Sequence, residues 1–378
     1  MSHHSSKEIR SKLTSDGTLE LSIVQAECPV PGDNDVLLKV EAAPINPSDL
    51  GLLISFAADL DHMSTSGEGE QAVTSIKIHP AFLGALKPRL NESMQVGNEG
   101  GAVVVDAGVN AKHLIGKTVG VAGGAMYSQY RCVPASSCLV MNEGTTSVEA
   151  ASSFVNPLTA LAFLETMKME NHSALLNTAA ASNLGQMLVK ICLDDGVPLV
   201  NVVRSPAQVE TLKKLGAEYI CDTSAESFMD DLVNALVATG ATLGFDATGG
   251  GTGGKLPGQI LAAMEIAANK TATEYSRYGS NTYKQVYIYG GLDKSPTILN
   301  RSYGMQWGLG GWLLTPMIGR IGMPRFGAMR ERVAKEIKTT FASHYTQEIS
   351  LADMLQPEII RGYAKQATGE KYLVKPHQ

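Results

Sequence analysis

Strand and helix signals alternate from residue 173 onward, and this alternation constrains the fold of the 378-residue chain more than any other feature. Short apolar runs rich in β-type residues are separated by helical runs. The strand-type runs lie at 173–178, 198–203, 219–221, 243–247 and 285–289, with helical runs at 184–193 and 206–215. Parallel strands need long crossover connections, which are usually helical. The sequence therefore predicts an α/β fold with a doubly wound parallel sheet.

The first part of the chain has a different character. Short β-type runs such as 35–40 and 101–105 are punctuated there by Gly and Pro. A chain of this length is too long for one ordinary core, so we expect two domains. A last short strand at 371–374 suggests that the end of the chain returns to the first domain. The predicted division is a mostly β domain of residues 1–155 and 301–378, and a second domain of residues 156–300.

Two polar segments interrupt this pattern. The segment near 57–95 is rich in Ser, Gly and Glu and is too weakly apolar for a core, so we interpret it as a surface insertion. A second polar stretch lies at 268–284. Either segment could shape substrate access or a contact between subunits, and the sequence leaves both alternatives open.

Charge and hydropathy exclude several classes of partner. The net charge is −6, and Lys and Arg are scattered, so the basic patch required for nucleic-acid or anionic-membrane binding is missing. The start of the chain lacks the apolar run of a signal peptide. The most hydrophobic later stretch, 307–318, lies between Arg301 and Arg320 and contains Pro316. We expect a cytoplasmic protein with no membrane span and a small-molecule partner. The five cysteines form no CxxC pair and are predicted to be reduced core thiols.

The turn after the first strand of the predicted sheet is made of small residues. Ala181, Ser182, Asn183 and Leu184 open the following helix, whose positive end can receive a pyrophosphate. Against the GxGxxG pattern of dinucleotide-binding turns, only Gly185 remains. A small-residue turn that merely opens a buried helix is the alternative interpretation.

The end of the second strand favours the nucleotide interpretation. It carries Arg204 and Ser205, about 20 residues beyond the glycine, where an NAD-binding sheet places an acidic residue. A guanidinium there can instead receive the 2′-phosphate of NADPH. The alternative is an exposed arginine at a strand end. We therefore predict NADPH as the cofactor.

Three ordered motifs before this turn resemble a known superfamily. They are Ala43-Pro-Ile-Asn-Pro-Ser-Asp49, Val96-Gly-Asn-Glu-Gly-Gly101 and Val155-Asn-Pro-Leu-Thr-Ala160. The chain resembles the medium-chain dehydrogenases/reductases, and within them the zinc-free quinone oxidoreductases and 2-enoyl thioester reductases. The resemblance implies a Rossmann domain, a GroES-like catalytic domain and a homodimer formed through the edge of the nucleotide-domain sheet, which we place at 285–289.

The resemblance also implies roles for individual residues. Asn156, Thr159, Tyr289 and Gly290 would hold the nicotinamide end of the cofactor, and Asn46 would line the substrate side. Lys371 matches a position near the cofactor phosphates, although a solvated lysine is an alternative. The positions of the catalytic zinc ligands match Asn46, Asn98 and Asn156, and amides are poor zinc ligands, so no metal is expected. Asn98, which stands in place of a histidine ligand, can reflect simple drift at a site without metal or can retain a role.

Reduction of a conjugated oxygen requires a hydrogen-bond or proton donor. Enoyl reductases of this branch carry a tyrosine soon after the NPSD motif, whereas residues 52–56 contain none. Tyr127 is a possible substitute, with a buried structural tyrosine as the alternative. We predict an NADPH-dependent, zinc-independent oxidoreductase that reduces a quinone or a conjugated carbonyl. An enoyl-thioester or enone reductase and a non-catalytic NADPH-binding protein are the alternatives.

Overall fold

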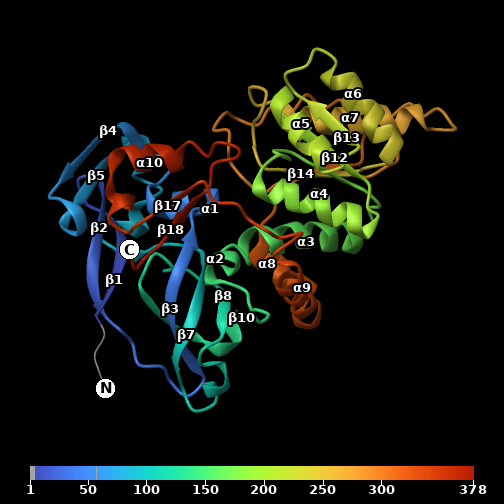
Figure 1. Ribbon diagram of the computed structural model, residues 1–378. Coiled ribbons are helices and arrows are strands. Elements are labelled where there is room, and N and C mark those ends of the chain that lie inside the picture. Colours follow the sequence, from blue (N-terminus) through green and yellow to red (C-terminus); the bar gives the residue numbers. More distant parts are fainter. Residues whose placement is uncertain (1–4, 57) are drawn as a thin grey trace. The chain divides into compact units, whose positions relative to one another are not determined.

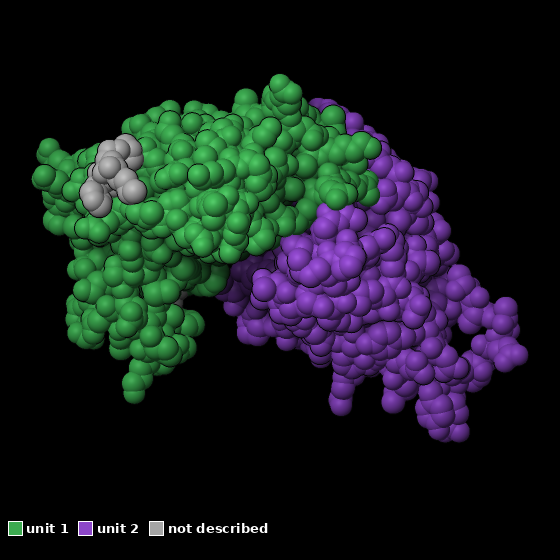
Figure 2. All heavy atoms as spheres, turned by 90° about the horizontal axis from the view of Figure 1, so that it is seen from below, with its two compact units in different colours: residues 1–155, 330–378 green, residues 156–329 purple. Residues whose placement is uncertain are grey.

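The structure, a computed structural model, describes residues 5–56 and 58–378 and divides the chain into two compact units. Unit 1 runs up to Val155 and from Arg330 onward, and unit 2 spans Asn156–Met329 (Figure 2). The first division falls where the sequence pattern changes. The second comes later than predicted: residues 301–329 belong to unit 2 because strand β16 (Trp307–Gly311) pairs with β15 (Lys284–Ile288).

Unit 2 is built on a six-stranded parallel sheet with the order β13-β12-β11-β14-β15-β16. Figure 1 shows β12, β13 and β14 of this sheet among the helices of the unit. The remaining strands are β11 (Leu175–Asn177), β12 (Leu199–Val203), β13 (Tyr219–Asp222) and β14 (Leu243–Asp246). Counted from β11, this is the 3-2-1-4-5-6 order of dinucleotide-binding sheets, with the direction of winding changing between β11 and β14. The prediction of a doubly wound parallel sheet is confirmed.

Helices cover both faces of this sheet. They are α3 (Val155–Met169), α4 (Asn183–Asp195), α5 (Pro206–Lys214), α6 (Phe228–Thr239), α7 (Leu256–Lys270), α8 (Leu314–Ile321) and α9 (Met323–Glu336), the last of which continues into unit 1. On one face, Leu176 and Val200 belong to a core that includes α6 and α7. On the other, Phe163 of α3 stacks on Phe245 of β14 with ring centroids 3.8 Å apart.

The edge of this sheet differs from the prediction. Residues 285–289 were expected at the edge, but β15 is flanked by β14 and β16, so the edge strand is β16. The hydrophobic stretch at 307–318 supplies this strand and the start of α8. Within residues 5–56 and 58–378, no helix combines the length and apolar character needed to cross a bilayer.

Unit 1 contains two mostly antiparallel sheets. A five-stranded sheet has the order β4-β5-β2-β1-β6, and a seven-stranded sheet has the order β10-β8-β7-β3-β18-β17, with β9 also paired to β3. Their strands are β1 (Ser5–Leu13), β2 (Thr18–Glu27), β3 (Asp35–Pro44), β4 (Ala58–Ser66), β5 (Val73–Ile78), β6 (Ser93–Gln95), β7 (Glu99–Ala107), β8 (Thr118–Ala122), β9 (Tyr130–Pro134), β10 (Cys138–Val140), β17 (Gln347–Ile349) and β18 (Tyr372–Val374). The predicted return of the chain end is confirmed by the pairing of β18 with β3.

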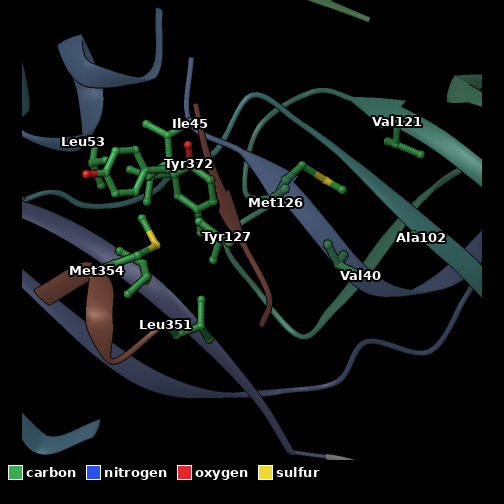
Figure 3. Close-up of a cluster of buried hydrophobic side chains, with 14 of the residues drawn as sticks. Val40, Ile45, Leu53, Ala102, Val121, Met126, Tyr127, Leu351, Met354 and Tyr372 are labelled. Atoms are coloured by element: carbon green, nitrogen blue, oxygen red, sulfur yellow. The ribbon is translucent and has the colours of Figure 1, made fainter. Parts of the chain in front are cut away.

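Short helices pack against the main apolar core of unit 1. They are α1 (Pro47–Leu53), α2 (Ser147–Ala150) and α10 (Pro357–Ala364), with 3-10 turns at Gly69–Gln71, Pro80–Phe82, Lys87–Arg89, Lys112–Leu114, Ala135–Ser137 and Asp353–Leu355. The core joins residues distant in sequence, such as Val40, Tyr127 and Tyr372 (Figure 3). Burial of this apolar surface is the main force that holds the unit together.

The surface-insertion prediction is wrong for residues 72–78. Thr74, Ile76 and Ile78 alternate along β5 and are buried, and both isoleucines belong to the unit 1 core. Only one face of the strand is apolar, so its signal is short and is masked by the polar residues around it. Of the free cysteines, Cys138, Cys192 and Cys221 are buried, while Cys28 and Cys132 are half-buried.

The second polar stretch forms the connection from α7 to β15. Its end is anchored by a buried ion pair between Lys284 Nζ and Glu265 Oε2, 2.6 Å apart. Ser280 also donates its main-chain and side-chain hydrogens to Glu265. Tyr275 and Tyr278 are exposed on the loop. The loop is therefore fixed at its base and open at its tip.

Candidate functional site

The predicted nucleotide-binding residues of unit 2 gather at the carboxyl edge of its sheet. The turn after β11, the end of β12 and the segment after β15 meet there because parallel strands end at the same edge. The turn is tied to its neighbour by a hydrogen bond from Ala180 N to Val202 O, and Tyr289 N donates to Asp246 O at 2.9 Å. Small-molecule sites in such sheets lie at this edge, beside the point where the winding reverses.

The turn after β11 explains why Gly185 is retained where other glycines of the pattern are lost. A Cβ atom on Gly185 would overlap the carbonyl group of Ala180, so α4 packs directly against the turn. Ser182 caps α4 by accepting a hydrogen bond from Gly185 N at 3.1 Å. Ala179 adopts a left-handed φ of 50°. The result is a tight turn that brings main-chain atoms to the positive end of a helix.

Arg204 and Ser205 lie directly after β12, beside this turn. The side chain of Arg204 is exposed, and its main-chain N donates to Gln208 Oε1 at 3.0 Å. Ser205 precedes α5, which begins with Pro206. Among the described residues, the Arg204 guanidinium forms no ion pair. A cation without an internal counter-charge is available to an external phosphate.

Sequence reasoning missed Asp246 at the end of β14. Its buried carboxylate accepts from Thr178 Oγ1 at 2.6 Å, from Thr248 N at 3.0 Å and from Gly249 N at 2.9 Å. It thereby joins the turn after β11 to the turn after β14. The acidic residue at a strand end followed by Thr-Gly-Gly was the available signal.

The residues predicted for the nicotinamide end lie on two elements of unit 2. Asn156 and Thr159 are buried in the first turn of α3. Tyr289 is half-buried, packs its ring edge-on against Phe163, and its burial raises the pKa of the hydroxyl. A Cβ on Gly290 would contact the Ala247 carbonyl, so the two turns approach closely.

Asn46 is engaged inside unit 1 rather than lining an open surface. Its side chain is 2% exposed, and Nδ2 donates to Glu99 Oε1 at 2.8 Å. Its main-chain N donates to Asp49 Oδ2 at 2.8 Å, which makes Asn46 and Asp49 the capping box of α1. The structure therefore gives Asn46 a positioning role.

Glu99 is the centre of this network. Its second oxygen accepts the main-chain hydrogens of Phe154 at 2.9 Å and Val155 at 2.8 Å, and so caps the start of α3. Burial raises the pKa of the Glu99 carboxyl, while the positive charge of Lys371 acts in the opposite direction.

Lys371 lies close to Glu99 within unit 1. Its Nζ donates to Ser152 Oγ at 2.7 Å, and the same oxygen accepts from Tyr345 OH at 2.9 Å. Burial lowers the pKa of the ammonium to about 8, with Glu99 and Asp49 opposing that shift. The predicted alternative of a solvated lysine does not describe this environment.

Tyr127 is fully buried in the unit 1 core, as Figure 3 illustrates. Its hydroxyl donates to Pro44 O at 3.1 Å. Burial raises the pKa of this hydroxyl well above its ordinary value, and the neighbouring charge of Asp49 adds to the effect. These contacts favour the structural alternative over a proton donor.

Ser48 and Asn98 form a polar pair that is more accessible than the buried residues Asn46 and Tyr127. Asn98 Nδ2 donates to Ser48 Oγ at 3.0 Å, and Ser48 is exposed. Asp49 supports the pair from below, because its Oδ1 accepts from Asn98 N at 2.7 Å. Burial raises the pKa of the Asp49 carboxyl to about 7. The Ser48 hydroxyl accepts from Asn98 and retains its own hydrogen for donation.

The residues that match zinc-ligand positions are amides in both units. Asn46 and Asn98 lie in unit 1 and Asn156 in unit 2. In the part of the chain that the structure describes, no cluster of three or more His, Cys, Asp or Glu side chains could hold a metal ion.

Comparison with known proteins agrees with this architecture. No protein-family model matches the chain. It is 28% identical over 197 residues to a mitochondrial enoyl-[acyl-carrier-protein] reductase of Xenopus tropicalis, covering 50% of this chain and 48% of that protein. The human mitochondrial enoyl-[acyl-carrier-protein] reductase is 24% identical over 277 residues, covering 71% of this chain and 61% of that protein. The matches thus span about half to three fifths of these curated relatives.

Solved structures match over nearly the whole chain. A candidate NADPH:quinone reductase from Mesorhizobium loti has a TM-score of 0.71 at 23% identity, covering 100% of both chains. Another from Bacillus thuringiensis has a TM-score of 0.72 at 18% identity, covering 99% of both. A mycobacterial protein complexed with NADPH has a TM-score of 0.67 at 18% identity, covering 98% of this chain and 100% of that one. The predicted fold is confirmed: the chain shares the two-unit architecture of these structures, with one Rossmann and one GroES-like unit.

Proposed function

We propose that the chain is an NADPH-dependent oxidoreductase that reduces a quinone or another conjugated carbonyl by hydride transfer without zinc. One arrangement carries the proposal: the tight turn at Gly185 lies beside the exposed Arg204 at the carboxyl edge of a 3-2-1-4-5-6 sheet. The turn suits a pyrophosphate, and the guanidinium suits the additional 2′-phosphate.

The residues present fit this cofactor. The direct packing of Gly185 on Ala180 leaves main-chain atoms at the helix start open to close approach. Ala181, Ser182, Asn183 and Leu184 would hold the pyrophosphate, with Arg204 and Ser205 at the adenosine end. Asn156, Thr159, Tyr289 and Gly290 would hold the nicotinamide, which supplies the hydride when bound. Lys371 would act through its electrostatic link to Glu99.

The substrate side follows from accessibility. Asn46 and Tyr127 are buried and already hydrogen-bonded, whereas Ser48 is exposed and keeps a hydrogen to donate. We assign the Ser48 hydroxyl and the Asn98 amide to hydrogen-bond the substrate oxygen as negative charge develops on it. The buried carboxylates of Asp49 and Glu99 would keep that loop in place.

The test compares NADPH and NADH binding in wild type and in Arg204→Ala. We expect wild type to prefer NADPH, and the variant to lose about tenfold or more in NADPH affinity while NADH affinity stays unchanged. Lys214→Ala, which also removes an exposed cation from unit 2, should leave both affinities unchanged. Equal affinities for the two nucleotides in wild type would contradict the assignment of Arg204.

Turnover then separates substrate classes. Enoyl-thioester reduction is the second candidate, because the curated relatives are enoyl-[acyl-carrier-protein] reductases. Steady-state NADPH oxidation should be measured with a simple quinone and with a 2-enoyl thioester at matched concentrations. A higher kcat/KM for the quinone supports the main proposal, and the reverse supports the second. Tight NADPH binding without turnover of either compound would support the alternative of a non-catalytic NADPH-binding protein.

We also propose a cytoplasmic homodimer. The edge strand β16 pairs only with β15 among the described strands, so its outer hydrogen-bonding groups are available to a second copy.

A further inference from the structure

Two buried amide side chains in unit 2 have unmet hydrogen-bonding groups of opposite kind. Among the described residues, Asn177 Nδ2 and Asn201 Oδ1 are buried and have no hydrogen-bond partner. Asn177 is 0% exposed and Asn201 is 1% exposed. One atom is a donor and the other an acceptor, and buried groups of either kind are normally paired.

The sheet places these two residues side by side. Asn177 of β11 and Asn201 of β12 are register partners in a parallel pair, so their side chains lie next to each other on the same face. The amide of Asn201 is oriented by its own donations to Leu199 O at 3.3 Å and Tyr219 O at 3.2 Å. This orientation leaves its oxygen as the acceptor for a neighbour.

The other end of Asn177 leads to the candidate site. Asn177 Oδ1 accepts a hydrogen bond of 3.4 Å from Tyr289 OH. Tyr289 is half-buried at the carboxyl edge, and its main chain is held by Asp246 O. A rotation of the Asn177 amide that joins its Nδ2 to Asn201 Oδ1, while Asn201 keeps its own hydrogen bonds, would fix the acceptor that the tyrosine uses.

We propose that Asn177 and Asn201 form a buried amide relay that positions the Tyr289 hydroxyl for the nicotinamide. The proposal rests on the proposed function, because Tyr289 is assigned to the nicotinamide end there. Both asparagines are positioning residues, since neither is exposed to the cofactor. The relay acts on the geometry of the bound nicotinamide and leaves the phosphate contacts at Gly185 and Arg204 unchanged.

A double-mutant cycle tests this relay. Wild type, Asn177→Leu, Tyr289→Phe and the double variant are compared by NADPH titration and by single-turnover hydride transfer to a quinone. We expect each single variant to lower the transfer rate about tenfold with the NADPH Kd within about twofold of wild type. The double variant should be no slower than Tyr289→Phe, because Asn177 acts through that hydroxyl. Bound nicotinamide fluorescence should change equally in all three variants.

The outcomes separate this inference from the proposed function. If wild type binds no NADPH, the proposed function fails and the relay fails with it. If wild type binds NADPH but the two substitutions are additive, or Asn177→Leu transfers hydride at the wild-type rate, only the relay is overturned. Should Asn177→Leu not fold, Asn201→Leu replaces it in the cycle. NMR of the cofactor-free protein supplies a second measurement: Asn201→Leu should speed hydrogen exchange of the Asn177 side-chain amide, and unchanged exchange overturns the relay.

Discussion

The candidate regions of the two units are built by opposite means. In unit 2, the candidate site is shaped by main-chain geometry: Gly185 and Gly290 allow neighbouring turns to approach each other where any side chain would clash. In unit 1, the candidate site is held by buried charged groups, namely Asp49, Glu99 and Lys371. A tight turn leaves a local mark in the sequence. A buried charge network leaves no local pattern, because its members are far apart in the sequence. Ser152 and Lys371, for example, are 219 positions apart.

The largest expected effect comes from removing the central charge of unit 1. Glu99→Leu leaves three donors without their acceptor and removes the negative charge close to the Lys371 ammonium, so we expect a loss of about 3–5 kcal/mol in the free energy of unfolding. Urea unfolding at neutral pH measures it. Glu27→Leu, at an exposed position, should change stability by less than about 0.5 kcal/mol. Equal losses of stability for the two substitutions would contradict the statement that buried charge holds the candidate region of unit 1.

A smaller effect is expected from the turn of unit 2. Gly185→Ala forces α4 away from Ala180, which should cost about 1–3 kcal/mol and abolish NADPH binding. Gly319→Ala is the matched control, because nothing lies near its added Cβ within an exposed helix of the same unit. It should stabilise the protein by about 0.4–1 kcal/mol. Thermal unfolding and NADPH titration measure both, and normal NADPH affinity in Gly185→Ala would argue against the turn as the phosphate site.

A third effect depends on pH and sharpens the role of buried charge. Burial raises the pKa of Asp49 in the folded protein to about 7, above the ordinary value of 3.8, so the native protein holds this proton more tightly than the unfolded chain. The resulting stability is fully present below about pH 4 and is lost as pH rises through 7. Asp49→Asn removes this dependence, so the stability of wild type relative to the variant should fall steadily as the pH rises from about 4 to about 7.

Urea unfolding at several pH values measures that difference. Asp33→Asn, an exposed control in the same unit, should follow wild type across the range. If the difference in unfolding free energy between wild type and Asp49→Asn stays constant with pH, the pKa of Asp49 is not raised in the folded protein.

Local patterns determined how much of the molecule could be predicted. The sheet of unit 2 follows from alternating strand and helix signals, and each signal lies within a few residues. Strand β16 was missed because Gly308, Gly310 and Gly311 are poor strand formers and no helix precedes it. The core strand β5 was missed because only one of its faces is apolar.

The candidate site divides in the same way. The positions of the candidate phosphate turn and of Arg204 could be predicted because both follow a strand end directly. The engagement of Asn46 and Tyr127 could not, because their partners Glu99 and Pro44 are 53 and 83 positions away. Which side chains remain accessible depends on such distant contacts. Ser48 therefore became a candidate only when the fold was known, whereas the sequence had already left drift or a retained role open for Asn98.

The pairing of β18 with β3 has a consequence for how the chain folds during synthesis. Unit 2 is one continuous segment built from neighbouring strand-helix pairs, so it can fold as soon as it has left the ribosome. Unit 1 lacks β17 and β18 until residues 347–374 have been made, and until then the end of β3 at Ala43 and Pro44 has no β18 partner. Residues 347–374 thus complete a domain whose first strands are made before all of unit 2.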